Sequence, residues 1–129
     1  MSSLRADILA MRTRMFEGHP NHSGEFDIKH DAGGIVDIEF MVQFLVLAHA
    51  QTHPELLDNV GNIALLERAA RAGLTDATAA LACAQAYRDY RRQQHLMRLN
   101  DARYARVPAD AFAAQRLAVR GLWDQLLGS

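Results

Sequence analysis

The sequence has few of the residues that interrupt helices or cross-link a chain. Its 129 residues include three prolines and a single cysteine, Cys83. One cysteine cannot form a disulfide within the chain, so a disulfide-stapled scaffold is excluded. Cys83 lies in an alanine-rich apolar stretch, which predicts a small buried side chain rather than a reactive thiol. Alanine, leucine and arginine dominate the remainder, and these residues favour helix.

The chain also lacks an excess of either charge and any long apolar run. Its 14 basic and 15 acidic residues give a formal net charge of −1, so no global attraction to nucleic acid or to an acidic membrane is expected. The most apolar stretch, around residues 40–50, is interrupted by Gln43 and His49 and is too short to span a bilayer. The N-terminus has no basic head followed by an apolar core, so no signal peptide is expected. We therefore expect a cytoplasmic protein.

Hydrophobic periodicity predicts an all-α protein, a bundle of five helices with one short strand at about 25–29. The helices are expected at about 2–17, 34–51, 60–72, 75–99 and from 108 to the chain end. The whole of 1–129 forms one domain, in which 1–24 is a leading helix and loop, 25–34 a strand–turn junction and 34–129 the helical bundle.

Finer features follow from the same patterns. The second helix is apolar nearly all round, so we expect it at the centre of the bundle. Arg5, Arg12 and Arg14 are predicted to lie toward the polar side of the first helix. Thr75 is expected to cap the fourth helix, and Pro108 to begin the fifth.

A single strand is predicted over residues 25–30, where polar and apolar residues alternate and place Phe26 and Ile28 on one side. No second strand of this kind is evident, and an unpaired strand is not stable. Either the strand pairs with a weak partner, or its partner belongs to a neighbouring domain. The second interpretation makes the chain part of a larger protein.

The turn after this strand gathers residues that suit a nucleotide site: Lys29, Gly33, Gly34, Asp37 and Glu39. Backbone N–H groups at a helix start can attract an anion, a lysine can neutralise phosphate, and carboxylates can hold a basic side chain, a ribose hydroxyl or hydrated Mg²⁺. The alternative is an ordinary strand-to-helix turn in which Asp37 interacts favourably with the helix dipole. Asp37 and Glu39 are two residues apart on a helix, so they cannot chelate one ion together.

The junction also resembles a known family. The string 26–29 (Phe-Asp-Ile-Lys), the string 31–40 (Asp-Ala-Gly-Gly-Ile-Val-Asp-Ile-Glu-Phe) and the following Gln43 are similar to the C-terminal part of the bacterial glutamate–ammonia ligase (glutamine synthetase) adenylyltransferases. The similarity continues through Asp58-Asn-Val and the pair Leu65-Leu66 to Ala86-Tyr87-Arg88, and it covers the chain from about Leu4.

The resemblance implies a helical domain from the adenylylating half of an enzyme that transfers AMP from ATP to a tyrosine of glutamine synthetase. That family's catalytic domain carries a Gly-Ser and an Asp-x-Asp pair that binds two Mg²⁺. This sequence has no Asp-x-Asp, and its one Gly-Ser is Gly128-Ser129. We therefore expect a fragment that is inactive alone, with ATP and Mg²⁺ bound mainly by a preceding nucleotidyltransferase domain.

The resemblance also implies roles and partners. Lys29 and the Gly33-Gly34 turn would face the cleft, and Asp37 or Glu39 would orient a catalytic-domain arginine or the nucleotide. The strand would complete a sheet of the preceding domain. The partners expected are that domain, glutamine synthetase and a PII-type regulatory protein. No residue of this chain is assigned as catalytic or as a metal ligand.

A basic stretch between residues 88 and 106 leaves other functions open. Arg88, Arg91 and Arg92 begin it, and tyrosines are interleaved, a composition that can bind single-stranded nucleic acid. A solvated helix face is the ordinary explanation, and a docking surface for an acidic protein partner is another. Two alternatives therefore stand beside the enzyme fragment: a stand-alone interaction module and a nucleic-acid-binding helical domain.

Overall fold

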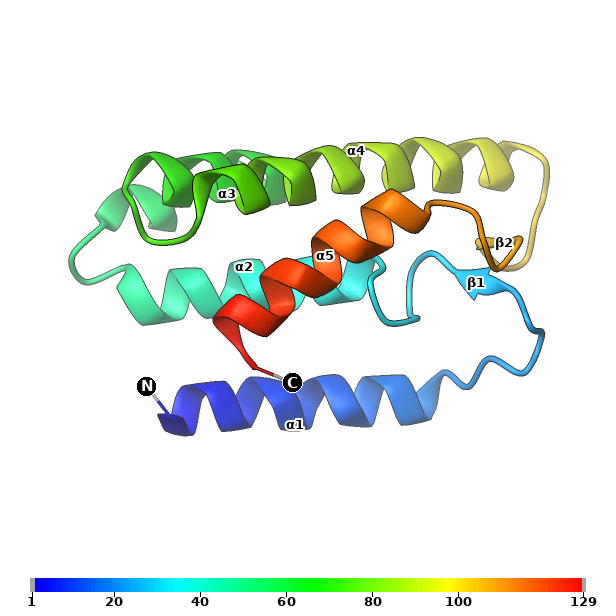
Figure 1. Cartoon of the computed structure of the whole chain (residues 1–129), viewed down its shortest axis with the longest axis horizontal. Helices are drawn as coiled ribbons and strands as arrows, with labels where there is room; N and C mark the ends of the chain where they lie inside the picture. Colours follow the sequence, from blue (N-terminus) through cyan, green and yellow to red (C-terminus); the bar gives the residue numbers. More distant parts are fainter. Residues whose placement is uncertain (1, 129) are drawn as a thin grey trace.

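The computed structural model describes residues 2–128 and shows a bundle of five α-helices with a small two-stranded sheet at one end (Figure 1). The elements in chain order are α1 (Ser2–Gly18), β1 (Phe26–Asp27), α2 (Ile35–His49), a 3-10 turn η1 (Pro54–Leu57), α3 (Asn62–Arg71), α4 (Ala77–Leu99), β2 (Arg106–Val107) and α5 (Ala113–Leu126). The predicted all-α class and the five helices are confirmed in the described residues. The short η1 turn was not foreseen.

Helix α2 lies at the centre of the bundle, as its apolar sequence predicts. It contacts α1 on one side and α3, α4 and α5 on the other (Figure 1). Nine of its 15 residues are buried. A helix can be covered on so many sides only if nearly all its faces are apolar, which is the pattern of this segment.

Helix α4 is the longest element and packs against both α3 and α5. Its N-terminal cap differs from the prediction by one residue. The Asp76 carboxylate accepts a hydrogen bond from the N–H of Ala79 at 2.8 Å, the geometry of an N-cap side chain. Asp76 therefore replaces Thr75 as the cap.

The last helix begins at Ala113, five residues later than the prediction from Pro108. The carbonyl of Pro108 accepts a hydrogen bond from the N–H of Ala111 at 2.9 Å, which closes one turn. Phe112 then adopts the left-handed region at φ 59°, so a continuous helix cannot pass through it. Its ring packs edge-on against Tyr90, with centroids 5.5 Å apart, and this contact holds the irregular backbone in place.

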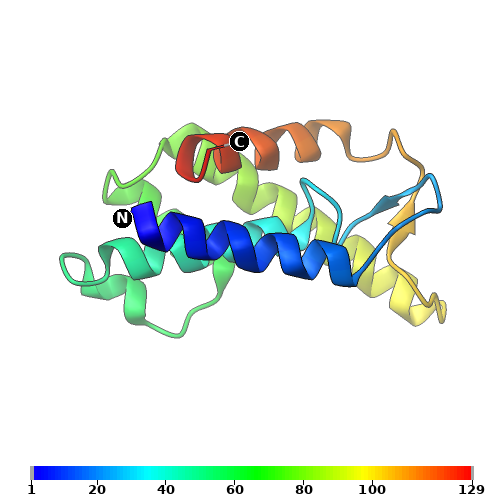
Figure 2. The same ribbon diagram turned by 90° about the horizontal axis from the view of Figure 1, so that it is seen from below.

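The strand finds its partner inside this chain. Phe26 faces Val107 and Asp27 faces Arg106 in antiparallel register, and the N–H of Ile28 donates to the carbonyl of Ala105 at 2.8 Å. Figure 2 shows the two strands side by side at the end of the bundle. The interpretation that the strand completes a neighbouring domain's sheet is therefore wrong. A two-residue partner is too short to leave an alternating pattern in the sequence.

The expectation that Cys83 is a buried, unreactive side chain is met. Cys83 is fully buried, and burial raises the pKa of its thiol to about 12, so it remains a protonated apolar side chain. Within residues 2–128, no helix is both long enough and apolar enough to cross a membrane.

Candidate functional site

The turn between β1 and α2 needs both of its glycines, for different reasons. Gly33 has φ +86°, in the left-handed region that other residues rarely adopt. Gly34 has an ordinary φ of −96°, but a Cβ on it would lie 2.3 Å from the carbonyl oxygen of Ile28. The chain therefore folds back so closely on itself that only glycine fits at position 34.

The backbone N–H groups at the start of α2 have acceptors within the chain. The N–H of Gly34 donates to Asp31 O at 2.9 Å, that of Ile35 to Ile28 O at 2.8 Å, and that of Val36 to Lys29 O at 3.0 Å. These groups were expected to attract an anion. In this structure they fasten the strand to the helix instead.

Asp37 is one of the most buried polar residues in the described chain. Its Oδ2 accepts a hydrogen bond from the N–H of Gly33 at 2.7 Å, and its Oδ1 accepts one from Arg12 Nε at 2.8 Å. The Asp37 side chain is 2% exposed and that of Arg12 16%. Arg12 therefore lies on the inner side of α1, which corrects its predicted place on the polar face. The arginine that Asp37 orients belongs to this chain.

Tyr90 on α4 completes the support of the turn, and sequence reasoning did not single it out. Its hydroxyl donates a hydrogen bond of 2.7 Å to the carbonyl of Gly33, and burial raises the pKa of this hydroxyl well above its usual value. Its spacing of seven residues from buried Cys83 places both on one helix face, a signal that could have marked it.

Two of the five predicted junction residues, Lys29 and Glu39, are solvent-exposed. The other three, Gly33, Gly34 and Asp37, are buried and make the contacts described above. The junction is therefore a rigid support, and Lys29 and Glu39 are the side chains that can reach a ligand.

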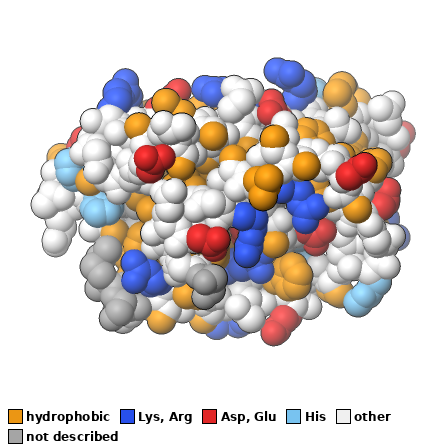
Figure 3. All heavy atoms as spheres, viewed as in Figure 1, with side chains coloured by type: hydrophobic (Ala, Val, Ile, Leu, Met, Phe, Trp, Pro, Cys, Tyr) orange, Lys and Arg blue, Asp and Glu red, His pale blue; other side chains and the backbone are white. Residues whose placement is uncertain are grey.

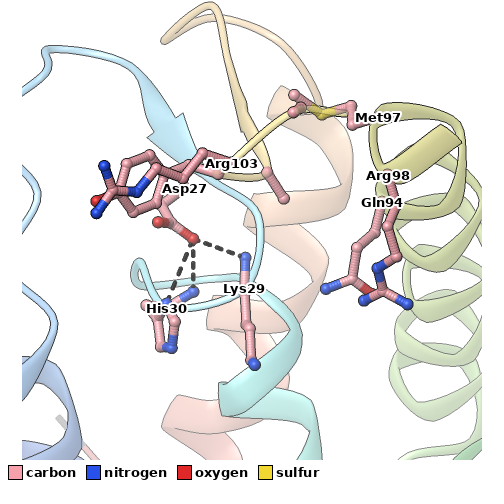
Figure 4. A pocket seen from close by; sticks show the side chains of 10 residues that line it. Asp27, Lys29, His30, Gln94, Met97, Arg98 and Arg103 are labelled. Carbon is pink, nitrogen blue, oxygen red and sulfur yellow. Dashed lines mark hydrogen bonds and ion pairs between the residues drawn. The ribbon is translucent and has the colours of Figure 1, made fainter. Parts of the chain in front are cut away.

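Lys29 lines a small cavity of about 290 Å³ between the β1–β2 sheet and the end of α4. Figure 4 shows Lys29 on one side and Gln94 and Arg98 reaching from α4 on the other. Arg103, in the loop after α4, also lines the cavity. The sequence did not predict that these side chains line one cavity, because 65 or more residues separate Lys29 from the α4 side chains.

The cavity has one acidic residue, Asp27, and its carboxylate is bonded to groups of the same chain. Its Oδ1 accepts the N–H groups of Lys29 and His30 at 3.0 Å each, and its Oδ2 lies 3.4 Å from Arg106 Nε. Burial lowers the pKa of His30 below its usual 6.5, against the opposing effect of Asp27, so its ring is neutral at pH 7. The remaining charges of the cavity are positive.

The three predicted docking arginines have different surroundings. Arg88 lies 3.5 Å from the Glu67 carboxylate, and Arg91 donates a hydrogen bond of 2.7 Å to Gln94 Oε1. Arg92 is exposed. Figure 3 shows acidic and basic side chains interspersed over the face of the molecule seen there, without a patch of one sign.

The carboxylates around the junction do not fit a divalent metal. Asp27, Asp31 and Asp37 all accept hydrogen bonds from backbone N–H groups of the turn. Across residues 2–128, no three His, Cys, Asp or Glu side chains converge as a metal site would require. These three carboxylates therefore hold the turn in place.

Comparisons with known proteins show which family the chain belongs to. Residues 3–122 match the family described as GlnD PII-uridylyltransferase, and the chain belongs to that family.

Three relatives are each named bifunctional glutamine synthetase adenylyltransferase/adenylyl-removing enzyme. The protein from Bordetella bronchiseptica is 51% identical over 98% of this chain, that from Ralstonia nicotianae 54% over 98%, and that from Aromatoleum aromaticum 49% over 100%. The chain spans 13–14% of the length of these relatives. The expected resemblance to glutamine synthetase adenylyltransferases is thereby confirmed.

Proposed function

We propose that this chain is a helical domain of an enzyme that transfers AMP from ATP to a tyrosine of glutamine synthetase and so regulates nitrogen assimilation. The observation that carries the proposal is identity of about half over nearly the whole chain to bifunctional adenylyltransferase/adenylyl-removing enzymes. The preceding nucleotidyltransferase domain and glutamine synthetase are the partners this implies, and a PII-type regulatory protein is a further one.

In this proposal the domain forms one wall of the nucleotidyl-transfer site, while the metal-bearing wall belongs to another part of the enzyme. Gly33, Gly34, Asp37 and Tyr90 hold the wall rigid through the contacts between β1, α2 and α4. Lys29 presents its ammonium group to solvent beside this rigid turn, where it can neutralise negative charge on a phosphate. Glu39, exposed one turn along α2, orients a basic group of the facing domain.

The test uses the full-length enzyme that contains this segment, purified glutamine synthetase and labelled ATP. Lys29→Gln is expected to lower AMP transfer about tenfold or more, because a preorganised charge near the reacting phosphate is lost. Arg71→Gln is the matched control, since it removes one exposed cation from the opposite end of the bundle. Equal transfer by both variants and the unaltered enzyme would contradict the role of Lys29.

The 129-residue chain on its own is expected to transfer no AMP, because it has no Asp-x-Asp pair to hold Mg²⁺. Its carboxylates at Asp27, Asp31 and Asp37 are engaged in structural hydrogen bonds. The same assay, with the isolated chain in place of the enzyme, measures this directly. Detectable transfer dependent on this chain would overturn the division of labour between the two walls.

A further inference from the structure

The cavity beside Lys29 has the size of a site for a small ligand. Its volume of about 290 Å³ lies at the lower limit of pockets that enclose drug-sized molecules. The β1–β2 sheet lies on one side of it and the last two turns of α4 lie on the other (Figure 4). The pairing of β1 with β2 and the hydrogen bond from Tyr90 to Gly33 hold these elements together, so the cavity is preformed.

The charges that face this cavity lack acidic partners. In the part of the chain that the structure describes, neither Lys29 nor Arg98 nor Arg103 has a carboxylate within ion-pair distance. Arg103 lies over the Tyr104 ring, with its guanidinium carbon 5.3 Å from the ring centroid. Lys29 and Arg98 line the cavity from opposite walls, Lys29 just after β1 and Arg98 on α4 (Figure 4).

Gln94 adds a directed donor to the same space. Gln94 is 8% exposed, and its Oε1 accepts a hydrogen bond of 2.7 Å from Arg91. Arginine can only donate, so this bond fixes the orientation of the amide and leaves its NH₂ group for the cavity. Within residues 2–128 this NH₂ group donates no hydrogen bond, and it is accessible from the cavity. An oriented amide with an unused donor, beside two cations that have no acidic partner, suits the binding of an anion.

We propose that Lys29, Gln94 and Arg98 form a binding site for the phosphate chain of a diphosphate or triphosphate. Two cations that line one cavity favour a multiply charged anion over a singly charged one. The cavity is too small to enclose a whole nucleotide, so the phosphates occupy it and any nucleoside lies outside. The inference rests on the proposed function in that it names the ligand chemistry of the wall to which Lys29 belongs.

The test is calorimetric titration of the 129-residue chain with inorganic diphosphate, inorganic triphosphate, orthophosphate, ATP and adenosine at low salt and at physiological salt. Diphosphate and triphosphate are expected to bind at least tenfold more tightly than orthophosphate, with weaker binding at higher salt. Lys29→Gln and Arg98→Gln are each expected to weaken diphosphate binding about tenfold, and Gln94→Leu to weaken it severalfold. Arg71→Gln is expected to leave it unchanged.

The outcomes separate the sources of the phosphate and the two proposals. ATP binding as tightly as triphosphate makes a nucleotide tail the ligand, whereas triphosphate binding with ATP excluded makes it free inorganic phosphate chains. Binding of adenosine alone, or equal weakening by all four variants, would overturn the site, and so would no binding of diphosphate by a chain whose circular dichroism shows it folded. If the chain fails to bind diphosphate while Lys29→Gln abolishes AMP transfer in the full-length enzyme, the proposed function stands and the phosphate site falls.

Discussion

Breaking the buried pair between Arg12 and Asp37 should cost a large part of the stability of this domain. The Asp37 carboxylate is 2% exposed and holds both Arg12 and the N–H of Gly33. Asp37→Asn keeps the shape but removes the charge, and its NH₂ group must face one of the two donors, Arg12 Nε or the N–H of Gly33, whose hydrogen bonds the carboxylate oxygens now accept. Removing one partner of a buried ion pair costs about 3–5 kcal/mol. Because Arg12 retains some exposure, we expect about 3 kcal/mol.

The measurement is urea unfolding followed by circular dichroism, with Arg12→Met, Asp37→Asn and the double variant forming a mutant cycle. Each single variant is expected to lose about 3 kcal/mol, since each leaves the other group buried without its partner. The double variant should lose clearly less than the sum, by about 1–3 kcal/mol, because the two groups are in contact. For a chain of this length, each single loss corresponds to a fall in Tm of about 10 °C.

The exposed pair between Arg68 and Asp58 is the matched control. It is as short, at 2.6 Å, but the side chains are 26% and 60% exposed. Asp58→Asn should therefore cost no more than about 1 kcal/mol. A loss below about 1 kcal/mol for Asp37→Asn, or strict additivity in the cycle, would refute the reasoning that burial makes the inner pair decisive.

Two further predictions concern the packing around the same turn. Gly34→Ala should destabilise the domain by about 1–3 kcal/mol, because the added methyl would lie 2.3 Å from the Ile28 carbonyl oxygen; a thermal melt equal to that of the unaltered chain would contradict this contact. Cys83 should react with a disulfide reagent at pH 8 only as fast as the domain unfolds, because the thiol is buried and its pKa is raised to about 12. Immediate labelling of native protein would show that the α4 face around it is open.

The sequence by itself determined the helices, the central helix and the place of the glycine-containing junction between β1 and α2. These features depend on local patterns: apolar residues at helical spacing, the glycine pair, and the continuous apolar surface of α2. The similarity of the junction to adenylyltransferases also lies in consecutive residues, so it was visible without a structure. Even the burial of Cys83 followed from its apolar neighbours.

Only the tertiary structure decided which partners those residues meet. Arg12 lies on the inner side of α1 because its guanidinium pairs with a buried carboxylate 25 positions along the chain. The helix pattern alone placed Arg12 on the polar face. The strand pairs with Arg106 and Val107 because α4 returns the chain to the same end of the bundle. For the same reason Lys29 faces Arg98 across a cavity. Contacts between distant segments are set by how helices pack, and no local pattern in a single sequence records them.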